Sequence, residues 1–495
     1  MDVRDFELTS RDGTAGFGDS ARISLLFHGV SVGGVALGGP RARRQLTLWR
    51  TLTSWARRPL LEELARRVIE HGVPPGEWQQ ALTSTDERPL PSVDVAICTR
   101  DRPEPLRLTL DALVPQVAPP CRVLVVDNAP STSATRAIVE SFRGRVHYTC
   151  EPTPGLDHAR NHALASSVAD VLAYVDDDVI ADDVWLPRLR RAFTDPDVAM
   201  VTGLVEPFAQ STQAERMFEA FGGFGRGSLR RWLVAPRHRP IAFPWANTGR
   251  YGTGANLAFR RTLLRDVGGF DPALDAGTPS AGGGDLEAMF RIVKAGGLHH
   301  YAPQCRVRHM HRTTMAELEA QLRSWGTGMS AHVASIRAAF PDERWALHAL
   351  DAWRFLRRLT SRVVMSAVLR PFPVSLAWAE LLGSLEGGRL YRAGQRPGPA
   401  RAWSPLPTGR PGVQAVNIDL ATLQEPLPAN GLSHLQVTAT LRGVSLGSLR
   451  LPACDGWLGR ERVRDAFIRR DPCRILGVPA DVALAPILDV ARRAL

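Results

Sequence analysis

From Val93 onward, short apolar strands alternate with helices at a regular spacing. Strands are predicted at residues 93–98, 122–126, 146–149 and 171–175, and helices between them at 105–113, 133–142 and 156–167. Alternation of this kind is typical of an α/β domain, in which a parallel sheet carries helices on its faces. Ligands of such sheets bind beyond the carboxyl ends of the strands. The residues that follow each predicted strand are therefore the first candidates for a functional site.

The last of these strands runs directly into three consecutive carboxylates. Residues 171–175 are apolar, and Asp176, Asp177 and Asp178 follow without a turn residue between. A charge cluster at the end of a buried strand is costly unless a positive group neutralises it. Carboxylate oxygens are hard ligands that suit Mg²⁺ or Mn²⁺, ions often shared with nucleotide phosphates. The alternative is a solvated turn leading into the helix predicted near Asp182.

Two other predicted strands also end in polar residues. Thr99 and Arg100 follow the first strand, and Asp127 follows the second. A carboxylate at a strand end can accept hydrogen bonds from base N–H groups or ribose hydroxyls, whereas a plain turn at Asp127 is the alternative. Since the carboxyl ends of parallel strands meet at one edge of a sheet, these residues and the acidic triplet are expected to converge.

Length and charge limit the classes of function. A chain of 495 residues has room for two or three domains, and its net charge of +11 favours anionic partners. No zinc pattern or aromatic-rich strand motif supports nucleic acid as a partner. The six cysteines are scattered without a CxxC pair, and no signal peptide is apparent at the N-terminus, so a cytoplasmic location is predicted. A basic amphipathic stretch near residues 357–370 adds peripheral contact with the inner face of the membrane as an alternative to core packing.

A similar hairpin pattern occurs near both ends of the chain. Residues 23–37 and 437–451 share the sequence Gly-Val-Ser-Val/Leu-Gly, and each copy precedes a predicted helix. The two copies are predicted to pack together, or on the central domain, as a small accessory module; two unrelated hairpins are the alternative. Residues 1–20 are expected to be a frayed end. The predicted segments are 1–88 (hairpin plus helix), 89–314 (central domain), 315–396 (mostly helical extension), 397–412 (linker) and 413–495 (hairpin plus helix).

An ordered set of motifs from Val93 to about Arg312 resembles the family-2 glycosyltransferases, which use nucleotide sugars and have the GT-A fold. The matching pieces are VDVAICTRDRP (93–103), VVDN (125–128), GLDHARN (155–161), YVDDD (174–178), GTGANLAFR (252–260), VGGFD (267–271) and GGDLEAMFR (283–291). Each piece alone is weak, but their order along the chain makes the resemblance specific. It implies a GT-A central domain, a nucleotide-diphosphate sugar as donor and a hydroxyl-bearing acceptor such as a glycan, a lipid-linked sugar or a small metabolite.

The resemblance also implies roles for named residues. Thr99, Arg100 and Asp127 would hold the base and ribose of the donor, and Arg160 would lie near its diphosphate. Asp178 would ligate Mn²⁺ or Mg²⁺, with Asp176 and Asp177 contacting the nucleotide, the sugar or the ion. His309 would complete the metal site, because in relatives a histidine after this strand has that place.

The catalytic base implied by the resemblance is Asp285, which would deprotonate the acceptor hydroxyl for an inverting displacement. Relatives usually have Glu-Asp at this point, whereas this chain has Gly284-Asp285. Glu287 is a candidate to compensate for the missing glutamate, or else only to favour the start of its helix. A catalytically degenerate module that binds carbohydrate or nucleotide is the alternative to an active enzyme.

Overall fold

The computed structural model describes residues 2–7, 20–27, 30–38, 47, 50–54, 56–70, 90–233, 248–250, 252–357, 363–364, 373–395, 410–454, 456–485 and 487. Its centre is a nine-stranded mixed sheet in the order β10-β12-β9-β11-β7-β4-β5-β6, with β8 paired to β12. The strands are β4 (Val93–Thr99), β5 (Arg122–Asn128), β6 (Val146–Glu151), β7 (Val171–Val175), β8 (Val179–Ala181), β9 (Val198–Pro207), β10 (Arg231–Leu233), β11 (Asn256–Arg260) and β12 (Leu298–His309).

The four strands predicted from the alternation form the parallel part of this sheet. β7, β4, β5 and β6 are neighbours and run parallel, with Thr99 opposite Asp127 in register. β11 joins antiparallel to both β7 and β9, and β12 runs parallel to β9. The prediction of an α/β domain built on a largely parallel sheet is confirmed.

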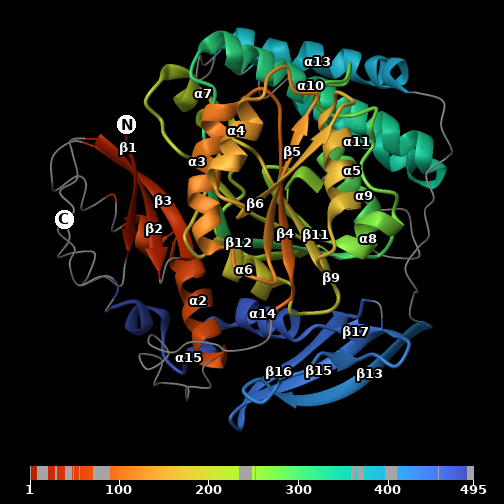
Figure 1. Cartoon of the computed structure of the whole chain (residues 1–495). Coiled ribbons are helices and arrows are strands. Elements are labelled where there is room, and N and C mark those ends of the chain that lie inside the picture. The colour runs from red at the N-terminus through yellow and green to blue at the C-terminus, as the bar shows by residue number, and fades with distance from the viewer. Residues whose placement is uncertain are drawn as a thin grey trace.

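Helices cover both faces of the sheet (Figure 1). They are α3 (Pro103–Leu113), α4 (Ala134–Ser141), α5 (Leu156–Ser166), α6 (Trp185–Ala192), α7 (Gln213–Phe221), α8 (Arg261–Asp266) and α9 (Gly284–Lys294). The apolar sides of α3, α4 and α6 share one hydrophobic cluster with the strands, and those of α5, α8 and α9 share another. Both clusters are built on alternate side chains of the same strands, as the period-2 pattern of a buried strand requires.

The predicted helical extension is also confirmed. It consists of α10 (Met315–Ala339), α11 (Arg344–Arg357) and α13 (Val374–Gly394). Thr314 and Glu317 form a capping box at the start of α10, which is why this helix begins where it does. A Cβ on Gly383 or Gly387 of α13 would lie 2.1 Å from a backbone oxygen of α10, so only glycine allows the two helices to pack this closely.

The two ends of the chain form sheets of identical topology. At the N-terminus β2 (Ser20–Phe27) and β3 (Val30–Gly38) are antiparallel, and β1 (Asp2–Glu7) lies parallel to β2. At the C-terminus β15 (Leu432–Leu441) and β16 (Val444–Pro452) are antiparallel, and β13 (Arg410–Asp419) lies parallel to β15. The expectation of a frayed end over residues 1–20 is wrong for the part described, because residues 2–7 pair with a strand some twenty residues further on.

The two hairpins also share a β-bulge at the equivalent position. In the first copy Leu25 faces Gly33, the next pairing skips one residue, and Phe27 faces Val30. In the second copy Ala439 faces Gly447, the pairing again skips one residue, and Leu441 faces Val444. This shared bulge accounts for the common glycine, which has a φ of +88° at Gly447.

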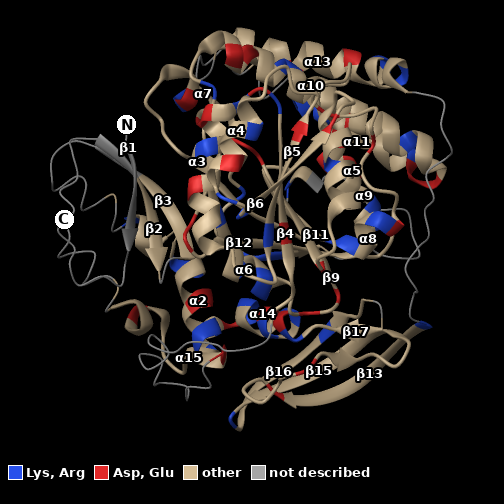
Figure 2. Cartoon of the chain, in the orientation of Figure 1, with Lys and Arg blue, Asp and Glu red and all other residues tan. Residues whose placement is uncertain are grey.

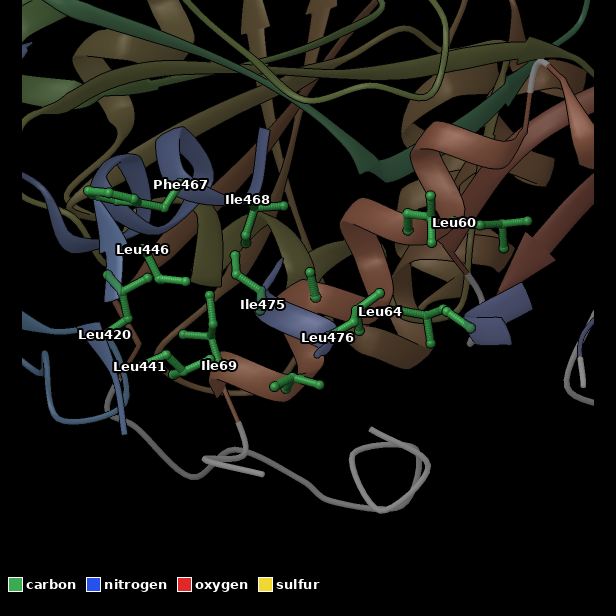
Figure 3. Close-up of a cluster of buried hydrophobic side chains, with 14 of the residues drawn as sticks. Leu60, Leu64, Ile69, Leu420, Leu441, Leu446, Phe467, Ile468, Ile475 and Leu476 are labelled. Carbon is green, nitrogen blue, oxygen red and sulfur yellow. The ribbon is translucent and has the colours of Figure 1, made fainter. Parts of the chain in front are cut away.

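The two ends share one hydrophobic core. Helix α2 (Arg57–Glu70) from the first segment packs with α14 (Arg460–Arg470) and α15 (Pro472–Leu476) from the second, and the short strands β14 (Leu427–Pro428) and β17 (Trp457–Leu458) pair beside them. Figure 3 shows side chains of both segments pointing into this cluster: Leu60, Leu64, Ile69, Leu420, Leu441, Leu446, Phe467, Ile468, Ile475 and Leu476. The helices that follow the two hairpins therefore pack together, in a cluster that includes side chains of both hairpins. Polar contacts such as Trp232 Nε1 to Asp465 Oδ2 (2.7 Å) join α14 to the central domain.

Candidate active site

A cavity of about 1100 Å³ lies at the edge of the sheet where β4, β5, β7 and β12 end. Its lining includes residues that end these strands, namely Thr99, Asn128 and His309, and Asp176, which directly follows β7. The opposite wall comes from the start of α9, from Trp325 of α10 and from Trp353 of α11. The structure therefore brings the strand-end residues together at one edge of the sheet, as the sequence predicted.

An arginine that the sequence analysis did not single out holds two members of the acidic triplet. Arg102 donates to Asp177 Oδ1 and, over 2.7 Å, to Asp178 Oδ2. Thr99 Oγ1 donates to the other oxygen of Asp177 over 2.6 Å, so each oxygen of that carboxylate accepts one hydrogen bond from the protein. Arg100, which was predicted to contact the nucleotide, lines the cavity with half of its side chain exposed. The two arginines thus differ in role, since Arg102 orders the carboxylates and Arg100 faces open space.

Asp176, Asp178 and His309 form a group of ligand atoms within 4.8 Å of one another. His309 Nε2 lies 3.1 Å from Asp178 Oδ1, which is buried and has no hydrogen bond of normal geometry within the described residues. An orphaned carboxylate oxygen beside an imidazole nitrogen is an arrangement that a divalent cation would satisfy.

The protonation of these three groups also suits a cation. Burial lowers the pKa of His309 to about 4, so its imidazole is neutral at pH 7 and can ligate a metal. Burial raises the pKa of Asp176 to about 7, and the charge of Asp178 contributes to the increase. The pKa of Asp178 is lowered, because His309 and Arg102 more than offset the effect of its burial. A divalent ion would relieve the repulsion between the two carboxylates, and the donor set of two oxygens and one imidazole fits Mn²⁺ better than Mg²⁺.

Asp285 lies at the start of α9 and faces the same cavity. Gly254 N donates to Asp285 Oδ2 over 2.6 Å, and Leu286 N donates to Oδ1 over 2.8 Å. Each oxygen thus accepts one backbone hydrogen bond and retains a further lone pair. Burial raises the pKa of Asp285, and the charge of Asp275 raises it further. A fixed carboxylate with a raised pKa is a suitable proton acceptor.

The glycine before Asp285 has a steric cause. A Cβ on Gly284 would lie 1.9 Å from Asp157 Oδ2, so no side chain fits there unless Asp157 moves. Asp157 is buried on α5 and pairs with Arg160 over 2.9 Å. The space that a glutamate side chain would begin to occupy is therefore held by a carboxylate from another helix.

Glu287 and Arg160 are both committed to ion pairs inside the protein. Glu287 makes two contacts of 2.7 Å with Arg291 on the same helix and lies outside the cavity lining. Arg160 lines the cavity, but its Nη1 donates to both Asp157 and Asp275, over 2.9 and 2.6 Å. Arg160 is 5% exposed, so its charge acts on the cavity mainly through its electrostatic potential rather than through direct contact with a ligand.

Asp127 lies at the end of β5, behind the cavity lining. Tyr148 donates to its Oδ2 over 3.0 Å, whereas Oδ1 is buried without a hydrogen-bond partner of normal geometry within the described residues. Burial raises the pKa of Asp127 above its ordinary value. Its neighbour Asn128, which lines the cavity, accepts from Gly155 N over 2.9 Å and so joins β5 to the start of α5.

An aromatic wall closes the cavity on the side of His309. Phe224 lies 4.8 Å from the His309 ring and 5.3 Å from the Trp325 ring, between centroids. His311 packs on Phe218 outside the cavity lining and is hydrogen-bonded to Glu219 over 3.0 Å. Of the two histidines, His309 is thus the one beside the carboxylates, as the sequence analysis favoured. The segment from α7 to Phe224 is a capped helix followed by part of this wall.

Residues 94–268 match the sequence model of the family described as "Glycosyl transferase family 2". A pre-mycofactocin glycosyltransferase of Mycobacterium tuberculosis (strain CDC 1551 / Oshkosh) is 29% identical over 242 residues, which are 47% of this chain and 46% of that protein. The succinoglycan biosynthesis protein ExoM of Rhizobium meliloti (strain 1021) is 37% identical over 224 residues, which are 43% of this chain and 65% of that protein. The chain thus spans about half to two thirds of the length of these relatives.

Among solved structures, the chain is similar to a mannosyltransferase of Pyrobaculum calidifontis in complex with GDP-Man and Mn²⁺. The match has a TM-score of 0.43 and 18% identity, and covers 69% of this chain and 97% of the other. The family predicted from the ordered motifs is confirmed by the sequence comparisons, and the matched residues 94–268 include β4 from Asp94 onward, β5 and β7, which end at the cavity. This segment of the chain is a glycosyl transferase family 2 domain.

Proposed function

We propose that this protein is an inverting, metal-dependent glycosyltransferase that moves a sugar from a nucleotide-diphosphate sugar to an acceptor hydroxyl. The observation that carries the proposal is the arrangement of Asp176, Asp178 and His309 on one wall of the cavity, with Asp285 on another. The names of the matched relatives support glycosyl transfer without pointing to one acceptor.

In this proposal Asp178, Asp176 and His309 hold Mn²⁺ or Mg²⁺. The ion would act as a Lewis acid that neutralises the charge of the departing diphosphate. Arg102 keeps Asp178 ionised and oriented, and Thr99 and Arg102 together orient Asp177. Arg100 lines the cavity and is available to the nucleotide, whereas Asp127 lies behind the lining at the end of β5. The field of Arg160 favours a diphosphate nearby.

Asp285 takes the proton of the acceptor hydroxyl. Because Gly254 N and Leu286 N fix both carboxylate oxygens, the group is oriented before the acceptor binds. Asp275 is already paired with Arg160, which leaves Asp285 as the carboxylate on this side suited to accept a proton. A single displacement assisted by one base inverts the anomeric centre. The proposal includes acceptors that are held at a membrane surface.

Release of nucleoside diphosphate tests this function. Purified protein is incubated with UDP-, GDP-, dTDP- and ADP-sugars, each with Mn²⁺, with Mg²⁺ and with EDTA. We expect one donor to be consumed in the presence of a divalent ion and none in EDTA, with slow transfer to water if no acceptor is present. If no donor is consumed or bound under any metal condition, the degenerate-module alternative replaces the enzyme.

A further inference from the structure

Exposed apolar side chains gather on α11 and α13. Of the sixteen large hydrophobic residues that the structure describes as exposed, eight lie between residues 345 and 385. Seven of them are on the two helices and define what we name the α11–α13 apolar surface: Trp345, Trp353, Phe355, Leu356, Val374, Trp378 and Leu385. Such a concentration on a small part of a chain points to contact with another apolar body.

The surface follows helical spacing. Trp345, Ala349, Ala352 and Leu356 are three or four residues apart and so share one side of α11, where Trp345 is 82% exposed. Val374, Trp378 and Leu385 share one side of α13 in the same way, while its glycines pack against α10. Both helices lie at the end of the molecule opposite β13–β16 (Figure 1).

Basic residues outnumber acidic ones on α11. This helix has Arg344, Arg354 and Arg357 against one acidic residue, Asp351, whereas α13 has two of each sign. Asp351 is paired, since it lies 3.4 Å from Arg337, and Asp342 and Glu343, which precede α11, each lie 2.5 Å from Lys294. On α3 and α4 of the central domain, by contrast, acidic and basic residues are mixed (Figure 2). The surface therefore combines exposed Trp and Leu with an excess of Arg.

We propose that the α11–α13 apolar surface docks on a bilayer with anionic headgroups. Exposed Trp and Leu on one side of a helix, flanked by Arg, are what a helix lying in the membrane interface presents. A second copy of the chain fits less well, since a two-fold interface would place the same arginine-rich surface against itself. Trp353, Arg354 and Arg357 of α11 also line the cavity, so docking brings its mouth to the lipid surface. If the proposed function holds, the acceptor is carried at that surface.

Vesicle binding tests this inference without any turnover. Full-length protein is sedimented with phosphatidylcholine vesicles that contain or lack phosphatidylglycerol. We expect binding to the anionic vesicles, weakened by salt, and a loss of about tenfold or more in the doubly substituted W345E/L356E. Val413→Glu, at a comparably exposed valine on β13, serves as the matched control and should bind as the wild type does. W345A/L356A replaces the charged variant if that one does not fold.

Three results would overturn the inference: no binding to anionic vesicles, equal binding by wild type and W345E/L356E, or a concentration-dependent dimer that the same substitutions abolish without vesicle binding. Stabilisation of W345E/L356E by a nucleotide sugar is measured in parallel. Nucleotide-sugar binding does not involve the α11–α13 apolar surface. If no nucleotide sugar stabilises the protein, the proposed function is contradicted, while the docking inference is still decided by vesicle binding.

Discussion

Asp285→Asn is expected to reduce kcat by about 10²–10⁴ while leaving the affinity for donor and metal unchanged, because the amide cannot accept the acceptor proton. The substitution preserves the shape of the side chain, and its single amide oxygen can still accept from one of the two backbone N–H groups, that of Gly254 or that of Leu286. The change should therefore appear in kcat rather than in KM for the donor.

The pH profile of the wild type provides a second readout of the same group. A base works when deprotonated, so kcat should fall as the pH drops through the pKa of Asp285, which burial raises above the ordinary value of an aspartate. Asp266→Asn, at an exposed aspartate that ends α8, is the matched control and should leave kcat unchanged. If Asp285→Asn turns over like the wild type, Asp285 is not the base.

Asp465→Ala is expected to lower the free energy of unfolding by about 3–5 kcal/mol, because it removes the closer counterion of a buried arginine, Arg66, and leaves it with Glu63 at 3.6 Å. Asp465 and Arg66 are 1% and 3% exposed and form a direct ion pair between α14 and α2. Trp232 also donates to Asp465, so the substitution loosens both the joint core of the two chain ends and its contact with the central domain.

Denaturant unfolding measures this effect, and Glu140→Ala is the matched control. Glu140 pairs with Arg136 at the surface, where both side chains are more than 60% exposed, and its loss should cost about 0–1 kcal/mol. Arg66 and two other arginines more than offset burial and lower the pKa of Asp465. The stability it supplies is therefore present above the ordinary pKa of an aspartate and lost as the pH falls towards its lowered pKa, so wild type and Asp465→Asn should converge in acid. Equal loss in Asp465→Ala and Glu140→Ala would contradict this account.

Much of the site follows from the alternation of strands and helices. Once Val93–Cys98, Arg122–Val126 and Val171–Val175 are taken as parallel strands, the residues after them must meet at one edge. Thr99, Asn128 and Asp176 do so, and the spacing of His309 from Asp178 completes the group.

Other features needed the tertiary structure. Nothing in the sequence distinguishes Arg100 from Arg102, which are two residues apart; the turn at Asp101, with a φ of +53°, directs one to the carboxylates and leaves the other open. Gly284 is explained only by Asp157, which is distant in the chain. β1 was missed because its partner strand lies beyond a polar, glycine-rich stretch, where local pattern carries no information on pairing.

Glu287 is different, because the sequence already held an argument against a place beside Asp285. Side chains two positions apart on a helix point about 200° away from each other. A helix that directs Asp285 to the cavity therefore directs Glu287 away from it. Glu287 is in fact paired with Arg291 inside the protein.

Donor-dependent thermal stabilisation tests the central claim, a metal-assisted nucleotide-sugar site built on Asp178, most directly. Wild-type protein and Asp178→Ala are melted with each nucleotide sugar, with and without Mn²⁺. At a donor concentration of 100 Kd, binding should add about 2.7 kcal/mol to the stability of the wild type when Mn²⁺ is present. The stabilisation should be lost without the ion and in Asp178→Ala. Equal stabilisation of both proteins, or none of either by any donor, would contradict the account.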